Sequence, residues 1–549
     1  MWLPWFLPDG GGDLLPTLIV NMEERERRIP FKAGRSLRDI LDTTDLRVRS
    51  GCGGRGACGL CRVSIDEGKG GVPTANERIY LDADELDQGI RLACQVMPTQ
   101  DLQISILAPA PKSLWRNLPD DAGKYMERLA ASPSKNLPLH VSTPYGLAVD
   151  LGTTHISLSL FELLSGKWLA GRYGRNPQMG YGSDVVTRLE AASDSTELAH
   201  VMNRQVVEAI YEALFDIAVR EGINMEQVVR LIMVGNTAML ALLSGRNYDL
   251  LLQPSHWMSP VDCLPSRSDL WAVPLGIHPQ AWVEVIAPLA GFVGSDLLAG
   301  VVSTHLTENG PGSLFIDFGT NSEIALWDGQ ILRVTSVAGG PAFEGSGISC
   351  GLPADPGAIY RVSLQNEVLD FAVISDSKPR GLCGSGLVDL ITALVKSGKL
   401  TNKGQFVSDV PNGGFVLTRG EQAMVLTKRD VDVFQRAKAA IGTGIQVLLT
   451  QAAMEYKDLR RIYVGGLFGR FLDIVNAQQI GLLPMIPPER VDLCGNTALA
   501  GCAEALLSSV AVQRLKDLRD QTRIINLSCW PDFDDLFLTN LYLQPMGGE

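Results

Sequence analysis

Four cysteines lie close together near the N-terminus of the 549-residue chain. Cys52, Cys58 and Cys61 follow C-x5-C-x2-C spacing, and Cys94 comes a short distance later. The thiolate form of cysteine is a metal ligand, and four thiolates are what a [2Fe–2S] cluster needs, two on each iron. A structural zinc site usually shows two C-x2-C pairs, whereas this segment contains one. The spacing therefore favours an iron–sulfur cluster bound by all four cysteines.

The loop that carries the first three cysteines is rich in glycine. Glycine allows a loop to wrap closely around an inorganic core and to direct its amides at the sulfides. The loop also contains Gly51-x-Gly53-x-x-Gly56, a formal match to the dinucleotide-binding fingerprint. We reject that interpretation, because the fingerprint needs a following helix within a βαβ unit and the sequence predicts none here.

Two glycine turns of similar sequence predict a phosphate-binding site. Asp150-Leu-Gly-Thr-Thr is echoed by Asp317-Phe-Gly-Thr-Asn, and each turn is followed by an alternating, strand-like segment. Such a turn brings amides and hydroxyls against phosphate oxygens, and the aspartate beside it can hold Mg²⁺ through water. One turn alone would be an ordinary hairpin, but the repetition strengthens the prediction. The chain has no G-x4-G-K-[ST] motif, so any ATPase here is not of the P-loop type.

A second echo pairs Ile232-Met-Val-Gly-Asn with Ile462-Tyr-Val-Gly-Gly. The glycine pair of the later copy, Gly465 and Gly466, allows an adenosine to approach the backbone closely. Two similar halves that face each other across a cleft would explain both echoes.

The elements that must position these residues divide the chain into several parts. Strands are predicted at residues 17–21 and 62–66, with a helix at 36–43 that begins at a serine cap. A proline-rich stretch with one short helix near residues 122–131 is typical of a linker. Strands and helices then alternate, which argues for an α/β body, with helices at 197–220, 387–396 and 431–454. The predicted parts are residues 17–106, a linker at 107–144, and two lobes at 145–310 and 311–549.

The composition excludes several classes of protein. The chain is 46% hydrophobic and 20% charged, which is enough apolar material for large buried cores. Its net charge of −13 argues against a general nucleic-acid binder. The sequence has no long apolar run and no basic region at its N-terminus, so we expect neither a membrane span nor a signal peptide. We expect a cytoplasmic protein, in which the six scattered cysteines are mostly small core residues.

The glycine motifs resemble those of the acetate and sugar kinase/Hsp70/actin superfamily. The two phosphate motifs would be residues 150–154 and 317–321, and the adenosine motif residues 464–466. The cysteine spacing departs by one residue from the plant-type C-x4-C-x2-C pattern and is similar to the vertebrate-type variant of that ferredoxin fold. Together, the two halves resemble the reductive activators of corrinoid proteins. The resemblance implies an α/β multidomain fold, with a β-grasp [2Fe–2S] ferredoxin domain, a linker and a duplicated actin-like or RNase H-like ATPase body.

This resemblance implies an ATP-dependent repair activity. The protein would transfer one electron through its [2Fe–2S] cluster to a partner corrinoid protein, returning Co(II) to Co(I) and restoring methyltransferase activity. Asp150 and Asp317 would orient Mg²⁺ and the attacking water. The residues expected to bind ATP are Gly152, Thr153, Thr154, Gly319, Thr320, Asn321, Gly384, Ser385, Gly465 and Gly466.

The cobalt should belong to a partner, because the chain lacks the corrinoid-binding motif D-x-H-x-x-G. The resemblance also implies a homodimer and a separate electron donor, whose identity the sequence does not give. His155, beside the first phosphate turn, is expected to be an ordinary surface or core residue.

Two other functions stay open at this point. The chain could be an ATP-gated electron donor to a different client, such as a radical-forming dehydratase, although activators of those enzymes carry a bridging [4Fe–4S] cluster and no ferredoxin domain. It could also be an electron carrier with a degenerate nucleotide site. A small-molecule kinase would leave the cysteine motif unexplained, and a chaperone would need a substrate-binding β domain for which no residues remain.

Overall fold

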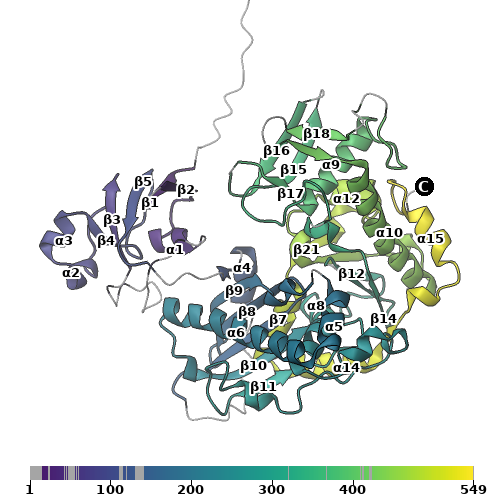
Figure 1. Ribbon diagram of the computed structural model, residues 1–549, viewed down its shortest axis with the longest axis horizontal. Coiled ribbons are helices and arrows are strands. Elements are labelled where there is room, and N and C mark those ends of the chain that lie inside the picture. The colour runs from purple at the N-terminus through teal and green to yellow at the C-terminus, as the bar shows by residue number, and fades with distance from the viewer. Residues whose placement is uncertain are drawn as a thin grey trace, which may run out of the picture. The chain divides into compact units, whose positions relative to one another are not determined.

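The structure, a computed structural model, describes residues 15–22, 25–42, 44, 46, 48, 56, 59, 61–109, 115–118, 120–129, 141–182, 184–319, 321–345, 347–365, 368–376, 378–407, 410, 413–418 and 423–547. Three predicted site residues, Cys52, Cys58 and Thr320, lie outside the described residues. The chain forms two compact units, Met1–Arg116 with Asp216–Ile223, and Asn117–Phe215 with Asn224–Glu549. Figure 1 shows the chain as a ribbon and labels many of the helices and strands of both units.

The N-terminal unit is built on a mixed five-stranded sheet in the order β2-β1-β5-β3-β4. Its elements are β1 (Thr17–Met22), β2 (Arg25–Pro30), α1 (Leu37–Asp42), β3 (Arg62–Glu67), α2 (Glu77–Tyr80), α3 (Ala83–Asp87), β4 (Ile90–Leu92) and β5 (Leu102–Ile106). β1 runs parallel to β5 and antiparallel to β2, whereas β3 is antiparallel to both β4 and β5. Alternate strand residues face the same side, so Val20 of β1 and Ile104 of β5 are buried in one core with Leu41 of α1. The predicted β-grasp, ferredoxin-like fold is confirmed, and the Ser36 hydroxyl caps α1 by accepting from the Asp39 amide at 3.1 Å.

The first half of the second unit contains a sheet in the order β11-β10-β7-β8-β9-β6. Its strands are β6 (Arg116–Asn117), β7 (Tyr145–Leu151), β8 (His155–Glu162), β9 (Trp168–Arg175), β10 (Val228–Gly235) and β11 (Trp282–Val285). The helices are α4 (Asp120–Arg128), α5 (Val185–Asp194), α6 (Thr196–Glu221), α7 (Thr237–Ser244) and α8 (Ser295–Ser303). The helices predicted at residues 122–131 and 197–220 correspond to α4 and α6.

The second half contains a sheet in the order β21-β20-β12-β13-β14-β22. Its strands are β12 (Ser313–Asp317), β13 (Ser322–Trp327), β14 (Leu332–Val337), β20 (Arg461–Gly465), β21 (Val491–Gly495) and β22 (Thr522–Ile524). Smaller sheets contain β15 (Ala358–Gln365), β16 (Val368–Val373) and β17 (Gly381–Leu382), and β18 (Phe415–Thr418) with β19 (Met424–Leu426). The helices are α9 (Gly384–Lys396), α10 (Lys428–Gln451), α11 (Gly466–Gly469), α12 (Ile474–Gln479), α13 (Thr497–Leu507), α14 (Ser509–Gln521) and α15 (Phe533–Asn540).

The two large sheets share their central arrangement. β7 is antiparallel to β8 and parallel to β10, just as β12 is antiparallel to β13 and parallel to β20. The echoed sequence motifs therefore occupy equivalent places, with each glycine turn joining the antiparallel pair. Several predicted helix boundaries were wrong: α9 begins at Gly384 and not at Leu387, and α10 begins at Lys428 and not at Val431. The end of α10 is also earlier than predicted, at Gln451 and not at Met454. The chain leaves the helix there, and Ala453 adopts a left-handed φ of 52°.

Helices α8 and α13 cross in close contact within the second unit. A Cβ atom at Gly501 of α13 would lie 2.0 Å from the carbonyl oxygen of Ala299 in α8, so the crossing requires glycine. α8 contacts strands of both large sheets, β10 of the first and β12 and β13 of the second. The two helices therefore pack where the halves of the duplicated body meet.

None of the helices in the described part of the chain is both long enough and apolar enough to cross a membrane.

Candidate functional site

The predicted cluster ligands that the structure describes, Cys61 and Cys94, lie side by side in the N-terminal unit. Cys61 comes directly before β3 and Cys94 two residues after the end of β4, and their buried sulfur atoms are 3.3 Å apart. Two thiolates held about 2.3 Å from one tetrahedral metal ion would be roughly 3.8 Å apart. A hydrogen bond with the Cys61 thiol lowers the pKa of Cys94 to about 6, which favours the thiolate that binds iron. The pair fits two ligands of a single iron.

A buried ion pair supports the strand that leads to Cys94. Arg91 of β4 donates to Glu77 through Nε and Nη2, both at 2.8 Å, and both side chains are buried. The amides of Thr74 and Leu92 donate to the same carboxylate at 2.8 and 3.1 Å. Burial raises the pKa of Glu77, but these hydrogen bonds outweigh it and the net shift is downward.

The first glycine turn joins β7 to β8 and faces a cavity. The Gly152 amide donates to the carbonyl oxygen of His155 at 3.0 Å, which closes the hairpin. Asp150, the next-to-last residue of β7, accepts a hydrogen bond from Asn496 Nδ2 at 2.8 Å. The Thr154 hydroxyl donates to Glu344 at 3.2 Å, so the turn contacts a residue from the second half of the body.

The second glycine turn and the glycine pair meet at the same cavity. Asp317 ends β12, and Gly466 begins α11 directly after β20. Gly466 has a φ of +85°, and a Cβ atom there would lie 2.3 Å from the carbonyl oxygen of Phe318, so this position requires glycine. A Cβ atom at Gly465 would meet the ring of Phe315 instead, and Gly465 does not line the cavity.

The cavity has a volume of about 230 Å³ and receives residues from both halves of the body. The predicted residues that line it are Asp150, Gly152, Thr153, Thr154, Asp317, Gly319, Asn321, Gly384, Ser385 and Gly466. His155, expected to be an ordinary surface or core residue, also lines it. So does Cys383, one of the scattered cysteines. Of the other five, Cys263 and Cys502 are buried, Cys350 and Cys494 are half-buried, and Cys529 is exposed.

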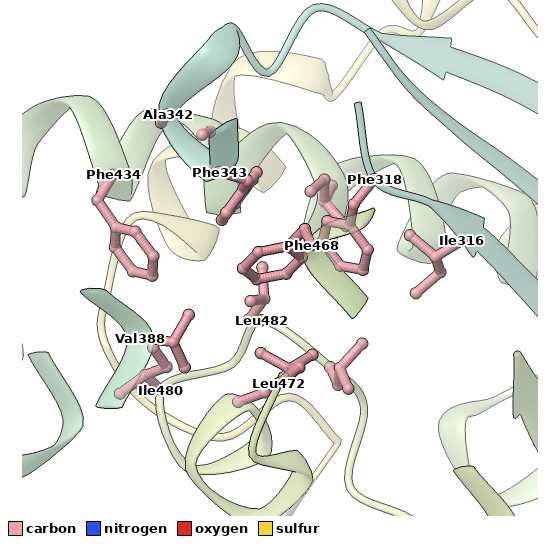
Figure 2. Packing of buried hydrophobic residues seen from close by; sticks show 14 of the residues in the cluster. Ile316, Phe318, Ala342, Phe343, Val388, Phe434, Phe468, Leu472, Ile480 and Leu482 are labelled. Carbon is pink, nitrogen blue, oxygen red and sulfur yellow. The ribbon is translucent and has the colours of Figure 1, made fainter. Parts of the chain in front are cut away.

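Three aromatic rings form an apolar wall beneath the phosphate turns. Phe318, Phe343 and Phe468 all line the cavity and have centroid separations of 4.9 to 5.4 Å. Figure 2 shows these three rings together in the buried cluster of the second half of the body. Rings at such distances prefer tilted or edge-to-face contacts, and this packing fixes the backbone on either side of Gly466.

Besides Asp150 and Asp317, four carboxylates line the cavity that were not predicted as site residues: Asp296, Glu323, Glu344 and Asp355. Asp296 lies in the first turn of α8, and Glu323 is the second residue of β13. The sequence feature that could have identified Glu323 as a cavity residue is its position two residues after the second glycine turn. Asp296 ends the segment Phe292-Val-Gly-Ser-Asp and is the second residue of α8, after the N-cap Gly294 and Ser295.

Four carboxylates of the cavity have pKa values above their ordinary range. Burial raises the pKa of Asp150 and of Asp317 to about 7, and the negative charge of Asp296 raises both further. Burial also raises the pKa of Asp296 to about 6. The pKa of Glu323 rises well above its ordinary value through burial and through the charges of Asp296 and Asp317. Such a group of acids is suited to a site that binds a cation and moves a proton near neutral pH.

Family models match three successive parts of the chain. Residues 20–99 match the 2Fe-2S iron-sulfur cluster binding domain, residues 145–309 the RACo middle region, and residues 312–548 the C-terminal domain of RACo, the ASKHA domain.

Curated relatives and a solved structure are similar over most of the chain. The corrinoid activation enzyme RamQ of Eubacterium limosum is 31% identical over 72% of this chain and 70% of its own length. A [Co(II) methylated amine-specific corrinoid protein] reductase of Methanosarcina barkeri is 28% identical over 68% of this chain and 71% of its own. The structure of a reductive activator for corrinoid, iron-sulfur protein superposes with a TM-score of 0.65 at 25% identity, covering 96% of this chain and 98% of that one.

Proposed function

The chain belongs to the family of reductive activators of corrinoid proteins, and we propose that it couples ATP hydrolysis to the one-electron reduction of a partner corrinoid protein. The partner's cobalt gains the electron and changes from Co(II) to Co(I), while a separate low-potential donor loses it. One observation carries the proposal. A single chain holds a ferredoxin-type pair of buried thiols and an acidic phosphate cavity between duplicated halves.

The iron–sulfur site is assigned to Cys61 and Cys94, together with Cys52 and Cys58 from the same sequence motif. A bound [2Fe–2S] cluster would supply one-electron redox chemistry there. The protein's own contribution is to hold Cys61 and Cys94 at the distance that one metal ion needs, and to favour the thiolate of Cys94.

The nucleotide site is assigned to the predicted residues, with Asp150 and Asp317 orienting Mg²⁺ and the attacking water. Among the described residues, no three His, Cys, Asp or Glu side chains are arranged to hold a metal ion directly. Mg²⁺ usually keeps several of its waters and binds through one or two carboxylates plus phosphates, which fits a water-mediated contact. We add Asp296, whose pKa of about 6 suits a group that accepts a proton near neutral pH.

We infer domain boundaries at residues 17–106 for the ferredoxin-like domain and 107–144 for the linker, followed by lobes at 145–310 and 311–549. The separation of the large sheets supports the limit at residue 311, since all strands of the second sheet follow it, whereas β6 of the first sheet lies within the range of the linker. The partner is a corrinoid protein of a methyltransferase system, as the names of the relatives suggest. The homodimer, the separate electron donor and the cytoplasmic location stay predictions.

The test is an anoxic assay that mixes the purified protein with a low-potential reductant and a Co(II) corrinoid protein. The absorbance of the corrinoid measures how much Co(I) forms. We expect Co(I) to appear only with Mg·ATP. Cys61→Ser should abolish it, whereas Cys529→Ser, at an exposed cysteine outside both sites, should not. Absence of ATP hydrolysis would favour an electron carrier with a degenerate site. An intact cluster and active hydrolysis without Co(I), across several corrinoid proteins, would favour a different client enzyme.

A further inference from the structure

Two side chains outside the phosphate motif hold the carbonyl groups of the first glycine turn. Asn176 Nδ2 donates to the Gly152 oxygen at 3.0 Å, and the Asn176 amide donates to the Thr154 oxygen at 2.9 Å. Between them, Arg188 Nη1 donates to the Thr153 oxygen at 2.7 Å. All three successive carbonyls of the turn are therefore occupied from one side.

This arrangement fixes the direction of the turn's amides. A peptide unit is planar and trans, so its N–H points away from its C=O. Holding the Gly152 and Thr153 oxygens toward Asn176 and Arg188 directs the amides of Thr153 and Thr154 to the opposite side. Both threonines line the cavity. Successive amides that converge on one point form an anion-binding site.

Arg188 also places a buried positive charge behind the turn. Its side chain is fully buried in α5, and Nε donates to the Gly182 oxygen at 2.8 Å. Burial lowers its pKa to about 10, which still leaves the guanidinium protonated at neutral pH. Nη2 is buried without a hydrogen-bond partner among the described residues. The charges of Asp184 and Glu344 raise its pKa, so the cation is partly compensated within the chain, but the unused Nη2 donor is still costly for the fold.

The side-chain amide of Asn176 both accepts and donates a hydrogen bond, and its position beside the first glycine turn requires both. Its Oδ1 accepts from the Gln178 amide at 3.0 Å, capping a short 3-10 turn, while its Nδ2 reaches the Gly152 oxygen. Met239 Sδ lies 3.5 Å from Asn176 Nδ2 and 3.4 Å from Arg188 Nη1, so α7 packs against both side chains. An aspartate at position 176 would keep the cap but could not donate to the turn.

The second glycine turn is held in a different way. The Phe318 amide donates to the Gly465 oxygen at 3.4 Å, and the Ser322 hydroxyl donates to the Gly319 oxygen at 3.4 Å. Among the described residues, these contacts join neutral groups, whereas the contacts of the first turn are shorter and include a guanidinium. The two echoed motifs are therefore not equivalent in their support.

We propose that Arg188 and Asn176 are positioning residues that preorganise the first glycine turn to bind the phosphate groups of the nucleotide. They act through the carbonyls of Gly152, Thr153 and Thr154, and Arg188 adds a positive potential on the far side of the turn. This inference rests on the proposed function, since it assumes that the cavity binds ATP. It extends the site to residues that no phosphate motif contains.

The test compares the affinities for ATP and for adenosine, which lacks phosphate, in Asn176→Asp and Arg188→Lys proteins. In Arg188→Lys we expect the Kd for ATP to rise about 10- to 100-fold, the range for losing a hydrogen bond made by a charged group. In Asn176→Asp, which loses a neutral hydrogen bond, we expect a rise of about 3- to 10-fold. The Kd for adenosine should be unchanged in both. The KM for ATP should rise more than kcat falls. Arg172→Lys is the control, because Arg172 is equally buried in β9 and its Nη1 donates to Gly171 instead.

Thermal unfolding of each variant verifies that it is folded. If the Arg188→Lys protein does not fold, the Asn176→Asp protein alone provides the test. Equal weakening of ATP and adenosine would overturn the proposal, because it would indicate general damage to the cavity. Unchanged ATP affinity in both variants would overturn it as well. If the parental protein itself does not bind ATP, the proposed function fails first, and that result is distinct from a failure of the variants alone.

Discussion

Buried carboxylates occur in both units but have opposite environments. In the N-terminal unit, Glu77 pairs with the Arg91 guanidinium and accepts two backbone amides, and its pKa is lowered despite burial. In the cavity of the second unit, the hydrogen bonds come from neutral donors, such as Asn496 to Asp150 and the Gly294 amide to Glu323. There the pKa of each carboxylate is raised by burial.

The presence or absence of a cation partner within the chain distinguishes a carboxylate that stabilises the fold from one that is available to a ligand. A buried carboxylate that finds a cation within the chain is part of the fold, and losing either partner leaves an unpaired charge. Carboxylates gathered without such a cation oppose the folded state at neutral pH and become favourable only when a ligand supplies positive charge. The four acids with raised pKa values therefore have the environment that the proposed Mg²⁺ and nucleotide site would need, whereas Glu77 already has its cation in Arg91.

The largest expected effect comes from removing one cavity charge. Asp317→Asn should lower the rate of ATP hydrolysis by about 10²- to 10⁴-fold, the range for losing a group that positions a proton transfer. The ligand-free protein should be as stable as the parent or more stable at neutral pH, because a buried negative charge is gone. Phosphate release and thermal unfolding measure the two effects. Hydrolysis at the parental rate would show that Asp317 is not in the site.

Removing the charge of Glu77 should have the opposite effect on stability. Glu77→Gln leaves Arg91 buried beside a neutral amide and should destabilise the N-terminal unit by about 3–5 kcal/mol. Loss of bound iron and lower resistance to urea would report the effect, and Glu67→Gln, at an exposed acid of the same unit, is the control. A stable Glu77→Gln protein with full iron content would contradict the comparison.

The two regions should also respond to pH in opposite directions. Folding raises the pKa of Asp150 and Asp317 from 3.8 to about 7, so their ligand-free contribution to stability falls as pH increases through that window. Folding lowers the pKa of Glu77 below 4.5, so its contribution is lost as pH falls below that value. Unfolding curves at pH 5 and pH 8 test the first sign, and Mg·ATP should reduce the loss at pH 8. Equal stability of the second unit at both values would count against buried, uncompensated acids.

Glu504 offers an intermediate case with the smallest expected effect. Its carboxylate accepts a hydrogen bond from the Tyr125 hydroxyl at 3.1 Å, a neutral partner, and burial raises its pKa. Tyr125→Phe should cost about 1 kcal/mol, the usual net value of one hydrogen bond. Thermal unfolding checks this, with Tyr211→Phe on the surface of α6 as the control. A loss of stability larger than that of Glu77→Gln would contradict the distinction between neutral and charged partners.

Residues whose role depends on a local pattern were predictable from the sequence. The cysteine spacing placed Cys61 and Cys94 in one site, and the echoed turns placed Asp150 and Asp317 at one cavity. The structure brings each pair together because a repeated hairpin, or a loop of fixed spacing, carries its own residues with it, while their roles in binding stay predictions.

Residues that reach the site through tertiary packing were not predictable in the same way. Asp296 enters the cavity from the start of α8, and Arg188 reaches the turn from α5. A lone aspartate or arginine on an amphipathic helix gives no signal of what it will face, since that depends on how the helix packs on the sheet. The predicted end of α10 at Met454 was wrong for a related reason, since apolar periodicity does not show where the backbone turns left-handed.

Because α8 and α13 cross, a change at the cavity can be detected at their opposite ends. Both helices begin at the cavity, with Asp296 on one and Thr497 on the other. Near their opposite ends, the Tyr125 hydroxyl donates to the Ser303 carbonyl at 3.2 Å and to Glu504. A single ring on α4 thus touches both helices beyond the point where they cross. A fluorinated tyrosine at this position would give a magnetic resonance signal sensitive to the angle between the helices, without a label inside the nucleotide site.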